Sequence, residues 1–309
     1  MSAPHVFDRR LILRRRRRAI GLGAATFLLD RVAEDMADRL AATLRSFSRG
    51  VDLATPGDAI RRALAGHPRL GTLIGVDALA DGATAVDGSA AGVAVVADAE
   101  ILPFADASLD LVVSGLALQT VDDLPGTFAQ VRRALRPDGL FLAALLGGAT
   151  LTELRQSFAL AETECEGGLS PRVAPFADIR DIGALLQRAG FALPVTDVDV
   201  VTVRYASPFA LMQDLRRMGA TNPLVERRRV PLRRATLMRA AEIYAEKFSD
   251  PDGRVRATVE IVWLSGWAPH ESQQKPLKPG SATHRLADAL GTKEISAGEK
   301  AGPGRARKS

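Results

Sequence analysis

Residues 94–148 read AVVADAEILPFADASLDLVVSGLALQTVDDLPGTFAQVRRALRPDGLFLAALLGG, and this stretch decides the fold. Two near-continuous apolar runs, LDLVVSGLAL (109–118) and GLFLAALL (139–146), are typical of strands covered by helices on both faces. Between them, Leu124 to Leu135 is amphipathic, and the Arg-Pro-Asp-Gly sequence at 136–139 is expected to stop that helix and turn the chain into the next strand. A strand, a crossover helix and a second strand predict a parallel α/β sheet.

Ligands of open parallel sheets bind beyond the carboxyl ends of the strands. On this stretch the candidate positions are Asp98, Ala99, Ser114 to Leu118 and Gly147-Gly148. Upstream, the run from Thr72 to Val76 ends at Asp77, the run from Val93 to Ala97 ends at Asp98, and a short strand and turn surround Asp52. An acid in such a place can bind ribose hydroxyls or an adenine amino group, or it can cap the turn that follows. The residues alone leave both interpretations open.

The 309-residue chain carries a net charge of +5, which raises the possibility of a nucleic-acid-binding protein. Much of the excess positive charge lies in Arg14 to Arg18 and in the last residues, GRARKS. Aromatic residues for base stacking make up 5% of the chain, and it has no recognisable nucleic-acid motif. We therefore expect no nucleic-acid partner. Basic ends of this kind more often associate weakly with an acidic protein or membrane surface, or keep the chain soluble.

One cysteine, Cys165, and four scattered histidines exclude a disulfide framework and argue against a metal site. These counts fit a cytoplasmic protein. Near the N-terminus the apolar run from Ala19 to Leu29 is short, contains Gly21 and Gly23, and lacks a cleavage-site pattern, so export is not expected. Apolar residues recur at every fourth position (Leu28, Val32, Met36, Leu40 and Leu44), which predicts an amphipathic helix on the protein body. The arginine run is interpreted as the solvated face of a first helix.

The pattern of apolar residues in the second half of the sequence predicts further helices and strands. Helices are expected at 151–164, 178–189, 209–218 and 234–248, and strands at 195–203 and 258–267. From Pro269 onward, Pro, Gly, Ser, Lys and Gln dominate, which indicates an extended segment and then disorder after about Gly291.

The motifs of the central stretch, taken together, resemble those of class I S-adenosylmethionine-dependent methyltransferases of the biotin-synthesis type. The shared strings are Asp98-Ala99-Glu100, Leu102-Pro103-Phe104, LDLV (109–112) and Arg-Pro-Asp-Gly (136–139). Three strings resemble the bacterial counterparts of a mitochondrial complex I assembly factor family: GGATLTELRQSFALAETECEGGLSPRVAPF (147–176), LMQDLRRMGATN (211–222) and GWAPHESQQKPLKPGSA (266–282). Members of that family have the methyltransferase fold and are known as protein arginine hydroxylases.

This resemblance implies a Rossmann-like, seven-stranded, mostly parallel sheet with an antiparallel last strand. It implies an N-terminal helical cover (1–48), a methyltransferase-like domain (49–268) with a helical insertion (207–250), and a C-terminal tail (269–309). The implied cofactor is S-adenosylmethionine: Asp77 would hold the ribose, and Asp98 with Ala99 would read the adenine. The loop from Asp52 to Asp58, with Ala54 and Gly57, would cradle the methionine part, and Ser114 and Leu116 follow the fourth strand at the same edge.

Two segments depart from the family pattern. The family has an acid followed by a Gly-x-Gly-x-Gly type of turn, whereas Asp52 is followed by Leu-Ala-Thr-Pro-Gly. A Cβ at Ala54 and a ring at Pro56 intrude where a glycine would let the backbone approach a ligand. After the fourth strand, the family's Leu-His-Trp-Val-Asn-Asp-Leu-Pro appears as LQTVDDLP (118–125).

Two main hypotheses remain open. The chain is a cofactor-dependent enzyme that methylates or hydroxylates a protein substrate, implied by the resemblance to be a respiratory complex I subunit. Alternatively, it is a non-catalytic assembly or binding protein that keeps the fold and has lost cofactor affinity. A carrier-protein or small-molecule methyltransferase fits the central motifs but leaves the second half unexplained. No individual catalytic residue is predicted.

Overall fold

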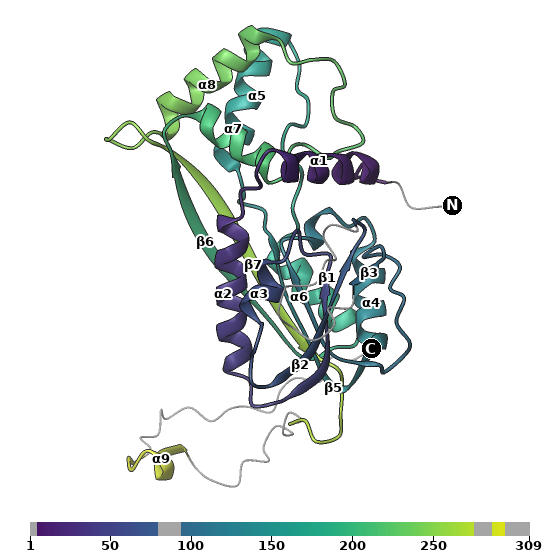
Figure 1. The fold of residues 1–309 in the computed structure, drawn as a ribbon. Helices are drawn as coiled ribbons and strands as arrows, with labels where there is room; N and C mark the ends of the chain where they lie inside the picture. The colour runs from purple at the N-terminus through teal and green to yellow at the C-terminus, as the bar shows by residue number, and fades with distance from the viewer. Residues whose placement is uncertain (1–4, 80–93, 275–285, 294–309) are drawn as a thin grey trace, which may run out of the picture. The chain divides into compact units, whose positions relative to one another are not determined.

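The computed structural model describes residues 5–79, 94–274 and 286–293 (Figure 1). By its contacts the chain divides into two units, Met1–His270 and Glu271–Ser309. The second unit contains one short helix, α9 (Leu286–Ala289), inside the segment for which an extended conformation is expected. The disorder expected after about Gly291 falls largely outside the described residues.

The first unit is built on a seven-stranded sheet with the order β3-β2-β1-β4-β5-β7-β6. Its strands are β1 (Phe47–Leu53), β2 (Leu70–Asp77), β3 (Ala94–Val96), β4 (Leu109–Gly115), β5 (Leu135–Leu146), β6 (Ala192–Tyr205) and β7 (Val255–Trp267). Strands β1 to β5 pair in parallel, whereas β7 runs antiparallel to both β5 and β6. The predicted mostly parallel sheet with an antiparallel last strand is confirmed. The carboxyl ends of β1 to β4 consequently meet at one edge.

Helices cover both faces of the sheet (Figure 1). The first unit contains α1 (Arg9–Gly21), α2 (Phe27–Ala41), α3 (Ala59–Ala63), α4 (Leu124–Ala134), α5 (Thr152–Glu166), α6 (Ile179–Arg188), α7 (Pro208–Arg217) and α8 (Arg234–Phe248). Apolar residues of α2 and α3 pack on one face, around Val113 and Trp263. Apolar residues of α4 and α6 pack on the other face, around Phe141. The two apolar clusters thus pack the central strands from both faces, and the pocket described below lies at the carboxyl ends of these strands.

Helices α5, α7 and α8 form a third apolar cluster with the ends of β6 and β7. These two strands extend past β5, whose pairing with β7 reaches no further than Ile261, and their extension contributes Val255 and Ala257 to the cluster. The first helix, α1, contacts α7 and lies between this cluster and the sheet (Figure 1). No helix of the described part of the chain is long and apolar enough to cross a membrane.

Several element ends differ from the predicted ones. The strand predicted at 109–118 ends at Gly115. Leu118 is nevertheless only 1% exposed, because it packs into the core from a short 3-10 helix rather than from the sheet. The helix α4 ends at Ala134, and β5 begins at once with Leu135 paired to Leu109. The Arg-Pro-Asp-Gly segment is therefore part of the strand rather than a separate turn. Leu44 is 87% exposed, because α2 ends before it.

Candidate functional site

A pocket of about 180 Å³ lies at the carboxyl ends of β1 to β4. Its floor consists of residues at or just after the ends of these strands, among them Ala54, Asp77, Asp98 and Leu116. Its roof is formed by α1 and by the segment 218–220 that follows α7. The pocket is therefore placed where the parallel topology predicts a ligand.

Five of the eight residues predicted to contact a cofactor line this pocket: Ala54, Asp77, Asp98, Ala99 and Leu116. They come from four separate loops, which the sheet brings together. Among the side chains, Asp77 is 1% exposed, while the side chain of Asp98 is 32% exposed at the pocket mouth. The structure thus gathers the two acids expected on the ribose and adenine side of the site.

The other three, Asp52, Gly57 and Ser114, lie outside the pocket lining. The Oδ2 atom of Asp52 accepts a 2.6 Å hydrogen bond from Nη1 of Arg61, and both side chains are buried. Another Arg61 nitrogen donates to the Gly57 carbonyl at 2.8 Å. The Ser114 hydroxyl donates to the Leu53 carbonyl at 2.7 Å. These contacts fix the end of β1 and the loop after it from outside the pocket.

The loop after β1 shows how this chain replaces the glycines of the family pattern. Ala54 adopts a φ of 58°, a left-handed conformation that favours glycine, and its N–H donates to the Val76 carbonyl. Ala54 and Pro56 both line the pocket. The Ala54 methyl group and the Pro56 ring reduce the space in the pocket above this loop.

Gln119, which stands where the family pattern has histidine, also lines the pocket. Its Nε2 donates to the Leu116 carbonyl at 2.7 Å, which fixes the amide orientation because a carbonyl can only accept. Its Oε1 is buried, and no donor among the described residues reaches it. A buried acceptor without a donor is costly, so this atom fits an N–H or O–H group of a ligand. Gln119 is therefore a third polar group of the pocket, beside Asp77 and Asp98.

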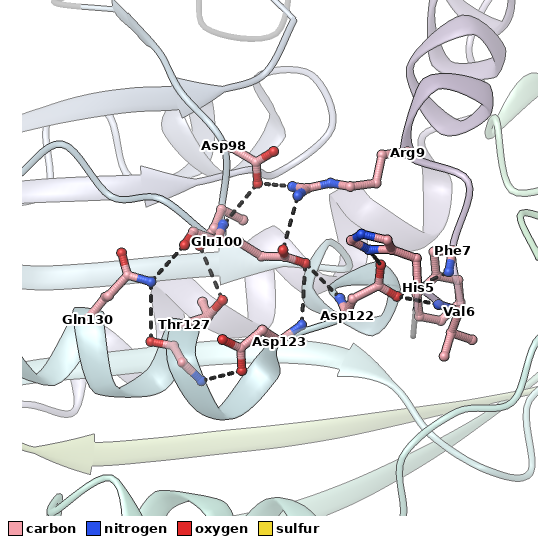
Figure 2. A network of polar contacts seen from close by, with 12 residues as sticks. His5, Val6, Phe7, Arg9, Asp98, Glu100, Asp122, Asp123, Thr127 and Gln130 are labelled. Atoms are coloured by element: carbon pink, nitrogen blue, oxygen red, sulfur yellow. Dashed lines mark hydrogen bonds and ion pairs between the residues drawn. The ribbon is translucent and has the colours of Figure 1, made fainter. Parts of the chain in front are cut away.

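Arginine side chains from α1 contact both acids of the pocket. Arg16 donates from both terminal nitrogens to the two carboxylate oxygens of Asp77, with an Nη1–Oδ1 distance of 3.1 Å. Arg9 donates to Oδ1 of Asp98 and, at 3.0 Å, to Oε2 of Glu100 (Figure 2). Glu100 continues the network, because its Oε1 accepts from the Asp122 backbone N–H at 2.7 Å. The interpretation of the arginine run as a solvated face holds for Arg14, Arg17 and Arg18, which are exposed, and is wrong for Arg15 and Arg16, which are half-buried and hydrogen-bonded.

Sequence reasoning missed Arg9, Arg16 and Glu100 as parts of this site. The spacing of Arg9 and Arg16 held a signal, because residues seven apart lie on one face of a helix. Nothing local in the sequence shows that this face meets the carboxyl ends of the strands.

Comparisons with known proteins agree with this geometry. Residues 51–143 match the family model described as a methyltransferase domain. A putative methyltransferase of Bacillus halodurans, solved by crystallography, superposes with a TM-score of 0.54 at 19% identity, over 77% of this chain and 99% of that one. The chain therefore contains a methyltransferase domain and has the α/β fold of that crystal structure.

Two relatives of known name are similar to this chain in sequence. The human protein named mitochondrial arginine-hydroxylase NDUFAF5 is 41% identical over 83% of this chain and 74% of its own length. The malonyl-[acyl-carrier protein] O-methyltransferase of Xylella fastidiosa is 42% identical over 56% of this chain and 56% of its own length. The chain belongs to the family of the NDUFAF5 arginine hydroxylases.

The expectation of a cytoplasmic protein is wrong by this comparison. The human, rat and zebrafish relatives all carry the word mitochondrial in their names. The cysteine and histidine counts behind that expectation indicate the absence of a disulfide framework, and such counts do not distinguish one reducing compartment from another.

The buried pair of Asp52 and Arg61 leads to a prediction about stability. Burial, only partly opposed by the Arg61 charge, raises the pKa of Asp52 to about 6. The folded state thus binds the proton more tightly than the unfolded state, and wild-type stability falls as the pH rises from about 4 to about 6. Asp52→Asn lacks this titration. We expect its free energy of unfolding to exceed that of wild type at pH 7 by an amount on the order of 1–3 kcal/mol, and the difference to vanish near pH 4.

Urea denaturation at pH 4, 5, 6 and 7 measures this difference. Asp110→Asn serves as the control, because Asp110 pairs with Arg136 in a more exposed place. An Asp52→Asn variant that is several kcal/mol less stable than wild type at pH 7 would show that the attraction to Arg61 outweighs the cost of burial.

Proposed function

We propose that this chain binds S-adenosylmethionine in the pocket at the carboxyl ends of β1 to β4 and modifies an arginine of a protein substrate. The observation that carries the proposal is the meeting of two acids in one pocket: Asp77, the last residue of β2, and Asp98, two residues after the end of β3. In this proposal Asp77 accepts hydrogen bonds from the ribose hydroxyls, and Asp98 with the backbone at Ala99 binds the adenine. Ala54 and Leu116 contact the rest of the cofactor.

Asp52, Gly57 and Ser114 act in this proposal as positioning residues. They hold the loop after β1 through Arg61 and through the Leu53 carbonyl. When bound, S-adenosylmethionine supplies an activated methyl group. The chain itself then has to align the donor with the acceptor and exclude water. This division of work is consistent with a pocket built from positioning groups.

The substrate is proposed from the family. The relatives' name states arginine hydroxylation. The resemblance of residues 147–282 to the complex I assembly factor family supports a protein substrate that takes part in respiratory complex I assembly. Methyl transfer and hydroxylation both remain within the proposal, since the site residues bind a cofactor rather than distinguish these reactions. The basic N-terminal segment gives a surface for an acidic protein partner.

A non-catalytic assembly protein is the second candidate. It is favoured by Ala54 and Pro56 in the glycine positions of the loop and by a pocket volume of about 180 Å³. Ligand pockets commonly measure roughly 300–1,000 Å³. The two candidates differ in one measurable property, which is the affinity for the cofactor.

Isothermal titration calorimetry with S-adenosylmethionine tests this property. We expect binding by the wild-type chain and a roughly 10- to 100-fold weaker affinity for Asp77→Asn, because a hydrogen bond to a charged acceptor contributes about 1.5–3 kcal/mol. Asp110→Asn, at the opposite end of β4, should bind like wild type. Absence of binding by the folded wild-type chain at millimolar ligand would favour the assembly protein.

Ala54→Gly probes the replaced glycine. Glycine adopts the observed φ of 58° without strain, and the change removes the methyl group from the pocket lining. We expect unchanged or slightly higher stability, within about 1 kcal/mol, and a several-fold tighter affinity for S-adenosylmethionine. Thermal unfolding and calorimetry on the same preparation measure both quantities. Equal affinities would show that the Ala54 side chain does not limit the site.

Mass spectrometry identifies the chemical product. Complex I subunits are compared between cells that contain this chain, cells that lack it, and cells that express the Asp77→Asn variant. We expect one arginine peptide to lose the mass of a methyl group or of an oxygen atom in the last two cases. Identical masses in all three would contradict arginine modification while leaving the calorimetric result intact.

A further inference from the structure

The two arginines that enter the pocket stand on one face of α1. Arg9 and Arg16 are two helical turns apart, and the acids that they contact lie at the carboxyl ends of the neighbouring strands β2 and β3. Exposed arginines of the same helix, such as Arg17, make no hydrogen bond or ion pair with a residue that the structure describes. The contact with the pocket is therefore made by Arg9 and Arg16 in particular, and not by the positive charge of the helix as a whole.

Arg16 occupies the whole carboxylate of Asp77. Both oxygens accept from its guanidinium, and Oδ1 also accepts from the Leu79 backbone N–H at 2.9 Å. The Arg16 side chain is 16% exposed, so the pair is largely screened from water. Two-point pairs of this kind are stronger than neutral hydrogen bonds. A ribose diol on Asp77 would need the same oxygens.

Arg9 makes a matching contact with the adenine side. Its guanidinium bridges Asp98 and Glu100, and Oδ1 of Asp98 also accepts from the Glu100 backbone N–H at 2.9 Å (Figure 2). The segment before α1 is fixed to the same network, because the backbone N–H groups of Val6 and Phe7 both donate to Oδ1 of Asp122 at 3.0 Å (Figure 2). The N-terminal end of α1 is thereby tied to the loops after β3 and β4.

We propose that α1 is a latch on the cofactor pocket: Arg9 and Arg16 compete with the adenosine part of S-adenosylmethionine for Asp98 and Asp77. This proposal rests on the proposed function and adds a regulatory contact to it. In the latched state the pocket measures about 180 Å³, and adenosine binds after the two arginines release the acids. The observed affinity then equals the affinity of the open state multiplied by the fraction of molecules that are open.

The contacts of α1 separate into a latch and an anchor. Arg9 and Arg16 contact the sheet loops, whereas Arg15 donates to the Thr221 carbonyl at 2.8 Å and Asp8 pairs with Arg227 at 3.0 Å. Release of the pocket acids by Arg9 and Arg16 therefore leaves these contacts in place, as well as those of the Val6 and Phe7 backbone with Asp122.

The test is calorimetry with S-adenosylhomocysteine, which has the adenosine part and no transferable methyl group. Wild type is compared with Arg16→Gln, with the double variant Arg9→Gln/Arg16→Gln, and with Arg17→Gln as the control that removes one charge from the same helix. We expect Arg16→Gln to bind about tenfold more tightly than wild type, the double variant at least as tightly, and the control equally.

A second measurement uses the wild-type chain. Hydrogen exchange of the backbone amides of residues 11–21 should become faster on addition of S-adenosylhomocysteine, because the ligand displaces the latch. This readout does not depend on the folding of any variant. Slower exchange, or no change at saturating ligand, would contradict the latch.

The calorimetric outcomes separate the two proposals. Equal affinity in all four proteins would overturn the latch and leave the proposed function standing. Weaker binding by Arg16→Gln would also overturn it, because Arg16 would then belong to the wall that holds the ligand. Absence of binding in every protein would overturn the proposed function, and the latch with it.

Discussion

A carboxylate as deeply buried as that of Asp77 must have hydrogen-bond donors around it, and this requirement organises the site. Desolvating a charged group without partners costs several kcal/mol. The parallel sheet places Asp77 at the carboxyl end of β2, where the backbone N–H of Leu79 provides one donor. The other donors come from Arg16, which lies 61 residues away in sequence and reaches the acid from α1.

The pair of Arg16 and Asp77 connects the N-terminal helix α1 to the pocket at the edge of the sheet. The guanidinium of Arg16 contacts both oxygens of Asp77, where the proposed function places the ribose, and α1 forms part of the roof of the pocket. The helix is in turn held on the segment 218–227 by Arg15 and Asp8. The region between β6 and β7, which carries α7 and α8, therefore also bears on the pocket.

The fold was predictable from residues 94–148 because apolar runs, and the Pro and Gly residues between them, are local properties of the sequence. The runs around Val113 and Phe141, and the helix between them, sufficed to predict a parallel sheet with a ligand edge. Asp77 and Asp98 were predictable for the same reason, since each ends a strand. The roles of Arg9 and Arg16 were not, because an arginine on a helix looks the same whether it faces water or an acid that is distant in sequence. Asp52 was predictable as an acid of the loop, and its partner Arg61 was not.

A crystal structure of the chain with S-adenosylhomocysteine tests the central claim most directly, because it shows which groups contact the carboxylate of Asp77. The account predicts ribose hydroxyls on Asp77, the adenine beside Asp98 and Ala99, and Arg16 withdrawn from the pocket. A complex in which Arg16 still holds Asp77 while the ligand is bound at another place would contradict it.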